Sequence, residues 1–140
     1  MDTILEKIRN LVNKGFKEIV LTGVDITCWG SDIAGNDKLG DLVNNILNET
    51  PNLPRLRLSS LDVSEMDDNL LHVFKTNKRM MPHLHLSLQS GNNLILKRMK
   101  RRHSREQAID LCRNLKAARP ELTFGADLIA GFPTESDTMF

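Results

Sequence analysis

The segment His83–Arg102, HLHLSLQSGNNLILKRMKRR, combines side chains that can bind a ligand with a change of secondary structure. Its first seven residues alternate leucine with a polar residue, which is typical of a strand with one polar face. The polar residues of this strand are His83, His85, Ser87 and Gln89. A turn at Ser90–Asn93 and a basic, helix-like segment follow. This order is how an α/β protein forms an anion or cofactor site at the carboxyl end of a parallel strand.

Positive charge is concentrated after that turn. Six of the nine residues Lys97–Arg105 are Lys or Arg, whereas the net charge of the whole 140-residue chain is only +1. The cluster is either a solvated helix face or a binding site for phosphate, carboxylate or RNA backbone. The total charge gives no argument for a nucleic-acid partner.

His83 and His85 form an H-x-H pair of the kind that holds Zn²⁺ in metal-dependent barrel hydrolases. His72 and His103 fall on or beside predicted helices, so further ligands at strand ends are missing. Histidines at such positions are also commonly interior residues with satisfied hydrogen bonds. A metal-dependent hydrolase is therefore the alternative function, and no metal ligand is predicted.

Length and composition indicate one domain of an ordinary globular protein. The residues Met1–Asn10 lack the apolar core of a signal peptide, and no run of about 18 apolar residues suggests a membrane span. The two cysteines, Cys28 and Cys112, form neither a disulfide framework nor a C-x-x-C metal site. We expect Cys112 to pack in the core and the protein to be cytoplasmic.

Hydrophobic periodicity predicts the element order α-β-α-β-α-β-α-β. Expected capping boxes are Thr3 with Glu6 and Ser104 with Gln107, and Gly15 is the expected stop of the first helix. The predicted helices span about 4–12, 39–47, 67–76 and 104–119, and the predicted strands 19–22, 55–60, 84–88 and 122–129; residues 25–37 are a predicted loop.

One side of three predicted strands is apolar and the other is polar. The apolar sets are Leu56 and Leu58; Leu84, Leu86 and Leu88; and Phe124, Ala126 and Leu128. A doubly wound sheet would bury both faces of its strands, whereas these strands have a polar side fit for a shared lumen. We therefore predict a parallel, partial (β/α) barrel with about four strands, with helices on the apolar side and a ligand site at the carboxyl strand ends. Four strands cannot close a barrel, so the sheet has open edges. We expect that two copies of the chain can associate through these edges.

Four segments resemble a known family: Glu18–Gly30 (EIVLTGVDITCWG), Arg55–Leu61 (RLRLSSL), His83–Arg105 and Gly125–Glu135 (GADLIAGFPTE). Together they resemble the radical S-adenosylmethionine core of the tRNA and ribosomal-protein methylthiotransferases. They are most similar to the branch that acts on threonylcarbamoyladenosine in tRNA. The resemblance covers nearly the whole chain.

This resemblance implies a partial barrel of six βα units and a transferase that adds a methylthio group to a modified adenosine in tRNA. It implies a [4Fe–4S] cluster on a C-x-x-x-C-x-x-C loop, S-adenosylmethionine as cofactor, a second cluster from an N-terminal domain and a C-terminal tRNA-binding domain. Residues 1–140 lack the cysteine motif. We therefore expect a single partial core domain, with the cluster loop just before Met1, that is inactive by itself.

By the same resemblance, Thr22, Gly23 and Asp25 at the end of the first strand meet the methionyl amino group. Ser87, Gln89 and Ser90 contact the ribose or methionine, and Arg98 or Arg101 pairs with the methionyl carboxylate. Ser59, Asp127 and Ile129 complete the predicted cofactor site. For Thr22 and Ser59 the alternative is a purely structural hydrogen bond to a neighbouring strand, and for Asp127 it is the role of a buried structural acceptor. The family often has glycine where this chain has Thr134.

A third hypothesis is non-catalytic: a fragment that binds RNA through Lys97–Arg105.

Overall fold

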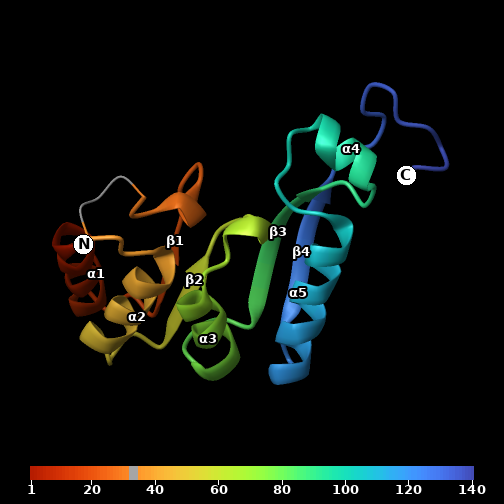
Figure 1. The fold of residues 1–140 in the computed structure, drawn as a ribbon. Helices are drawn as coiled ribbons and strands as arrows, with labels where there is room; N and C mark the ends of the chain where they lie inside the picture. The colour runs from red at the N-terminus through yellow and green to blue at the C-terminus, as the bar shows by residue number, and fades with distance from the viewer. Residues whose placement is uncertain (32–34) are drawn as a thin grey trace.

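The computed structural model describes residues 1–31 and 35–140, and within them four parallel strands lie side by side with helices against one face (Figure 1). The strands are β1 (Glu18–Leu21), β2 (Arg55–Leu58), β3 (His83–Gln89) and β4 (Thr123–Leu128). The helices are α1 (Asp2–Asn13), α2 (Leu39–Glu49), α3 (Asp68–Thr76), α4 (Asn93–Arg98) and α5 (Arg105–Ala118), with 3₁₀ turns η1 (Ile26–Cys28) and η2 (Val63–Glu65). The predicted alternation of helices and parallel strands is confirmed.

The four strands form two pairs with a narrow seam between them. β1 pairs with β2, and β3 pairs with β4, in parallel register. Between β2 and β3 only two isolated bridges, Leu56 with Met80 and Leu61 with Leu86, connect the described backbone. At the second bridge the Leu61 N–H donates to the His85 carbonyl oxygen, and the Ser87 N–H donates to the Leu61 carbonyl oxygen, both at 2.9 Å.

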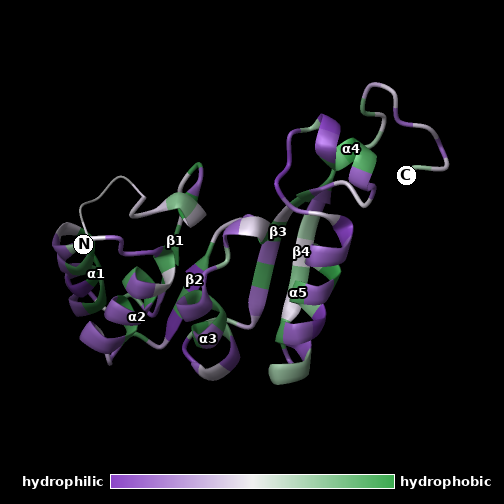
Figure 2. Ribbon diagram, in the orientation of Figure 1, coloured by the Kyte–Doolittle hydropathy of each residue, from purple (hydrophilic) through white to green (hydrophobic). Residues whose placement is uncertain are grey.

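The apolar side of the strands forms the core, as the alternation predicts. Leu56, Leu58, Leu84 and Leu86 are buried against apolar side chains of the helices. Figure 2 shows the corresponding hydrophobic stripes on the strands and on the inner sides of the helices. The prediction is wrong for Ala126 and Leu128, which are both exposed, Leu128 by 54%. β4 is an outer strand with a neighbour on one side only, so the end of its apolar set is left uncovered.

Local signals at the helix ends predict two positions correctly and one wrongly. Gly15, at φ +93°, ends α1, and the backbone N–H of Phe16 donates to the Leu11 carbonyl oxygen as in a Schellman motif. Ser104 and Gln107 form the capping box of α5. The predicted box of Thr3 with Glu6 is absent, because α1 already begins at Asp2 and places Thr3 inside its first turn.

The expected loop at residues 25–37 contains the short turn η1, and its positions 32–34 lie outside the described residues. The basic segment is less helical than expected. α4 ends at Arg98, and Lys100, at φ +58°, begins a turn that carries Arg101 and Arg102 across the ends of the strands. Within the described part of the chain, no helix is long and apolar enough to cross a membrane.

Candidate functional site

A polar cavity of about 340 Å³ lies at the carboxyl ends of the strands. Its walls come from the segments that follow β1 and β2, from β3, and from the basic turn after α4. The lining residues are Val24, Asp25, Thr27, Ser60, Asp62, Ser87, Lys100, Arg101 and Arg102. Parallel strands bring their carboxyl ends to one edge, which is why segments distant in sequence meet here.

Three of the predicted site residues meet in this cavity: Asp25, Ser87 and Arg101. Asp25 is exposed and accepts a hydrogen bond from the Thr27 hydroxyl at 3.1 Å. Arg101 donates from Nη2 to the Ser87 carbonyl oxygen at 2.7 Å. The cavity therefore presents a carboxylate on one wall and a guanidinium on another.

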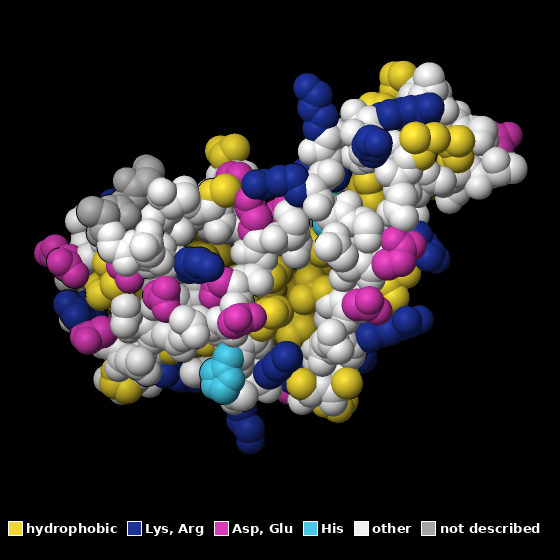
Figure 3. Space-filling model, in the orientation of Figure 1, with side chains coloured by type: hydrophobic (Ala, Val, Ile, Leu, Met, Phe, Trp, Pro, Cys, Tyr) yellow, Lys and Arg dark blue, Asp and Glu magenta, His cyan; other side chains and the backbone are white. Residues whose placement is uncertain are grey.

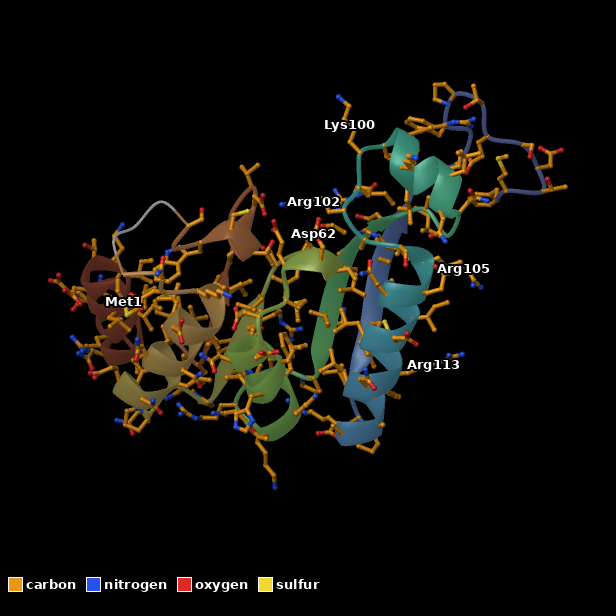
Figure 4. The ribbon with its side chains drawn as sticks, viewed as in Figure 1. Met1, Asp62, Lys100, Arg102, Arg105 and Arg113 are labelled. Atoms are coloured by element: carbon orange, nitrogen blue, oxygen red, sulfur yellow. The ribbon has the colours of Figure 1, made fainter. Side chains whose placement is uncertain are left out.

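Asp62, which the sequence patterns do not single out, holds Arg101 in place. Its Oδ2 accepts from Arg101 Nη2 at 2.7 Å, and its Oδ1 accepts from the backbone N–H and the hydroxyl of Ser64. Burial opposes ionisation of this carboxyl, but the hydrogen bonds from Ser64 and the charge of Arg101 outweigh it and lower its pKa. Figure 4 labels Asp62 beside Arg102. An acidic residue shortly after β2, in the same relation as Asp25 to β1, was the signal available in the sequence.

A second polar group, formed by Cys28, Glu65 and Arg102, borders the cavity. The Cys28 thiol donates to the Glu65 carboxylate at 3.4 Å, and Arg102 forms an ion pair with Glu65. Hydrogen bonds to Asp25 and Glu65 raise the pKa of Cys28 to about 11, so the thiol stays protonated at neutral pH. This group lies between the site cavity and a wider hollow of about 610 Å³ lined by residues 27–31, 36–38 and 64–67.

The polar face of the sheet contains an unsatisfied hydroxyl. Ser59 Oγ is buried and has no hydrogen-bond partner among the described residues, although the Ser59 backbone N–H donates to the Leu21 carbonyl oxygen at 2.9 Å. The structural alternative for Ser59, a side-chain hydrogen bond to a neighbouring strand, is therefore not what the structure shows.

The other predicted residues lie around the cavity rather than in its lining. Arg98 donates to the Thr134 carbonyl oxygen at 3.1 Å, so of the two arginines predicted for a carboxylate only Arg101 lines the cavity. Gln89 has φ +69°, and its carbonyl oxygen accepts from the backbone N–H of Ile129, which is exposed. Ser90 is buried, and its Oγ accepts from the Asn92 backbone N–H.

Thr22 and Gly23 are exposed residues between β1 and the cavity wall at Val24. Asp127 lies 3.5 Å from His85, but its side chain is 84% exposed, so it is not the buried acceptor of the alternative interpretation. Thr134 has φ +73°, a backbone conformation that favours glycine, which agrees with the glycine common at that position in the similar family.

His83 and His85 lie over Gly125 on the neighbouring strand, where a Cβ atom would come within 2.9 Å of His85 Nδ1. Among residues 1–31 and 35–140, the one group of three or more potential metal ligands is Asp25, Cys28 and Glu65. The H-x-H pair acquires no third ligand there, so the structure gives the hydrolase alternative no support.

Comparison with known proteins agrees with this architecture. The profile of the radical SAM superfamily matches residues 1–140. A threonylcarbamoyladenosine tRNA methylthiotransferase MtaB of Rickettsia prowazekii is 51% identical over 138 residues, covering 99% of this chain and 33% of that protein. A second MtaB, from Thermotoga maritima, is 36% identical over 140 residues, covering 100% of this chain and 32% of that protein.

A tRNA-2-methylthio-N(6)-dimethylallyladenosine synthase of Shouchella clausii is 38% identical over 139 residues, covering 99% of this chain and 26% of that protein. The chain thus spans about a quarter to a third of the length of these relatives. Because the superfamily profile covers all 140 residues, the chain belongs to the radical SAM superfamily.

Proposed function

We propose that this chain is the S-adenosylmethionine-binding part of a tRNA methylthiotransferase core. The observation that carries the proposal is the cavity in which Asp25, Ser87 and Arg101 converge at the carboxyl strand ends. S-adenosylmethionine has an ammonium for Asp25 and a carboxylate for Arg101. The relatives named as tRNA methylthiotransferases supply the reaction class and the substrate.

The residues present fit S-adenosylmethionine but not the iron–sulfur cluster that the resemblance implies. Among residues 1–31 and 35–140, Ser59 Oγ and Arg101 Nε are buried without a hydrogen-bond partner, which leaves polar capacity unused at and beside the proposed site. Cluster ligation needs several thiolates. The chain has two cysteines, and they lie in different elements: Cys28 in η1, bonded to Glu65, and Cys112 in α5, partly buried against the core. We therefore assign no cluster ligand to any residue of this chain.

In the proposed enzyme, S-adenosylmethionine bound to the cluster supplies the radical chemistry. The residues of this chain orient the cofactor. Asp25 accepts from the ammonium, Arg101 donates to the carboxylate, and Ser87 lines the same cavity. The residues that lie around this cavity and support it are Thr22, Gly23, Ser59, Gln89 and Ser90. Asp127 and Ile129 lie on and after β4, which we assign to the adenine side.

Equilibrium dialysis of the 140-residue chain with S-adenosylmethionine tests the proposed site. We expect saturable binding at one site that Asp25→Asn weakens about tenfold, because a hydrogen bond to a charged group contributes about 1.5 kcal/mol. Asp110→Asn is the matched control, since Asp110 is an exposed aspartate on α5 outside the cavity. Absence of saturable binding, or equal weakening by both variants, would contradict the proposal.

An exposed basic surface beside the cavity favours RNA as the substrate. Lys97, Arg98, Lys100, Arg102 and Arg105 are exposed around α4 and the start of α5. Figure 3 shows Lys and Arg side chains gathered over this part of the molecule, and in Figure 4 Lys100 and Arg105 point outward. We call these five residues the basic rim. A phosphate backbone on the rim would bring a base to the cavity, because Lys100 and Arg102 belong to both.

Neutralising three rim charges tests this assignment. We expect Lys97→Ala/Lys100→Ala/Arg105→Ala to weaken binding of a tRNA anticodon stem–loop. The slope of log K against log salt should also fall by about 2, because each phosphate that a cation neutralises contributes about 0.7 to that slope. Fluorescence anisotropy at several salt concentrations measures both quantities.

The control Lys7→Ala/Lys14→Ala/Lys17→Ala removes the same net charge from exposed positions at the opposite end of the chain. Equally weakened binding in the two triple variants would show that the total charge, and not the basic rim, binds the RNA.

A further inference from the structure

Arg101 is anchored through one nitrogen only. Its Nη2 donates to the Asp62 carboxylate and to the Ser87 carbonyl oxygen, both at 2.7 Å. A guanidinium has five N–H donors, and these two hydrogen bonds use two of them. Nε is buried without a hydrogen-bond partner among the described residues. The side chain is nevertheless 23% exposed, so the anchored guanidinium keeps the N–H groups of Nη1 available beside the cavity that it lines.

Asp62 is suited to holding a guanidinium because it is itself fixed. Its side chain is 14% exposed, and its Oδ1 caps η2 through the backbone N–H of Ser64 at 2.9 Å. The Asp62 carboxylate and Arg101 also come from opposite sides of the seam between β2 and β3. Asp62 follows β2, whereas Arg101 follows α4, and few backbone bridges join β2 to β3. The Asp62–Arg101 ion pair, together with the ion pair between Arg102 and Glu65, fixes the turn that carries Arg101 against the segment after β2.

His103 lies close to Asp62 but does not compete with Arg101 for its carboxylate. The His103 side chain is fully buried, its Nδ1 lies 3.8 Å from Asp62 Oδ1, and neither ring nitrogen has a hydrogen-bond partner among the described residues. Burial lowers the pKa of His103 against the opposing charge of Asp62, which favours a neutral ring at neutral pH. A neutral ring does not compete as a cation for the carboxylate.

We propose that Asp62 is a positioning residue, which fixes the Arg101 guanidinium so that its remaining N–H groups bind the carboxylate in the aminoacyl part of S-adenosylmethionine. The proposal rests on the proposed function for the identity of the ligand. It adds a residue that acts through Arg101, and it assigns the carboxylate to Arg101 rather than to Arg98.

Asp62→Asn tests the positioning role directly, because asparagine keeps the size and the capping ability of aspartate but removes its charge. We expect it to weaken binding of S-adenosylmethionine about tenfold, in line with the removal of one charge-assisted hydrogen bond. Binding of 5′-methylthioadenosine, which lacks the carboxylate, should be unchanged. Equal weakening of both ligands would show a purely structural role, and no weakening of either would also overturn the proposal.

A double-mutant cycle separates action through Arg101 from other effects. In an Arg101→Gln background, Asp62→Asn should cause no further decrease of S-adenosylmethionine affinity. Additive decreases would overturn the positioning role. Asp110→Asn serves as the control for removing an exposed carboxylate.

A measurement without any ligand keeps this inference separate from the proposed function. In ¹⁵N NMR of the 140-residue chain, we expect the Arg101 guanidinium to rotate slowly, and Asp62→Asn to speed up that rotation. Fast rotation in the unsubstituted protein would overturn the anchoring. If neither S-adenosylmethionine nor 5′-methylthioadenosine binds while the guanidinium is restrained, the proposed function fails and the anchoring remains.

Discussion

Replacing Arg119 by alanine is expected to lower the free energy of unfolding by about 3 kcal/mol, because each buried polar group left without a partner costs about 1–3 kcal/mol. Arg119 is 7% exposed, and its Nη1 donates to the carbonyl oxygens of Phe74, Asn77 and Met80 at 3.2, 3.2 and 2.9 Å. Phe74 lies in the last turn of α3, where helical partners are missing, and Met80 follows that helix. The Asn77 carbonyl oxygen also accepts from the Met80 N–H at 3.1 Å, so the substitution removes the donor chiefly from Phe74 and Met80. Urea denaturation followed by circular dichroism measures the change.

The control for this variant is Arg113→Ala, which removes an exposed arginine from α5, the helix that ends just before Arg119 (Figure 4). Exposed substitutions of this kind usually change stability by less than about 0.5 kcal/mol. If Arg119→Ala destabilised the protein no more than Arg113→Ala, the hydrogen bonds to the three carbonyls would contribute nothing net to stability.

Arg79 repeats this arrangement one βα unit earlier. Its guanidinium donates to the carbonyl oxygens of Leu47, Thr50 and Leu53, around the end of α2. Arg79 lies four residues before the start of β3, and Arg119 lies four residues before the start of β4. In both units an arginine thus satisfies the carbonyl end of the preceding helix.

Gly40→Ala is expected to destabilise the protein by about 2–3 kcal/mol, because overpacking costs about 1–3 kcal/mol and a cap is disturbed as well. A Cβ at position 40 would lie 2.2 Å from Asp67 Oδ1 and 2.4 Å from the Leu70 backbone nitrogen. Asp67 caps α3 by accepting from the Leu70 N–H, and it also accepts from the Gly40 N–H at 2.9 Å. The methyl group would force α2 and α3 apart at this point.

Gly91→Ala is the matched control for Gly40→Ala. A Cβ there would meet no atom within 4 Å, and the backbone φ of Gly91 is not positive. Thermal unfolding of the two variants compares them directly. Equal melting temperatures would mean that α2 and α3 separate at Gly40 without cost, contrary to the close approach of the two helices in the structure.

The cavity shows how far the sequence predicts which residues of the candidate site lie together. Asp25, Ser87 and Arg101 are predicted from strand ends and family resemblance, and they meet in one cavity. Arg98 and Arg101 cannot be distinguished by sequence, since both follow β3. They separate because α4 ends at Arg98 and the turn at Lys100 sends Arg101 back towards β2.

Asp62 is not predicted from the sequence because its role depends on an ion pair across the seam between β2 and β3, with a partner 39 positions away in sequence. The same limit applies to Arg79 and Arg119. Each resembles an ordinary surface arginine in the sequence, and its partners are backbone carbonyls, whose positions depend on how the helices pack.

The sequence alone determined the alternation of helices and strands, the apolar and polar sides of the strands, and the resemblance to the radical SAM superfamily. These follow from local periodicity and from residue types, which need no knowledge of distant contacts. Only the tertiary structure decided which polar residues share the cavity, which arginine faces it and which acidic residue anchors that arginine. Such arrangements depend on how separate strands and helices are brought together, and the spacing of residues along the chain does not encode that geometry directly.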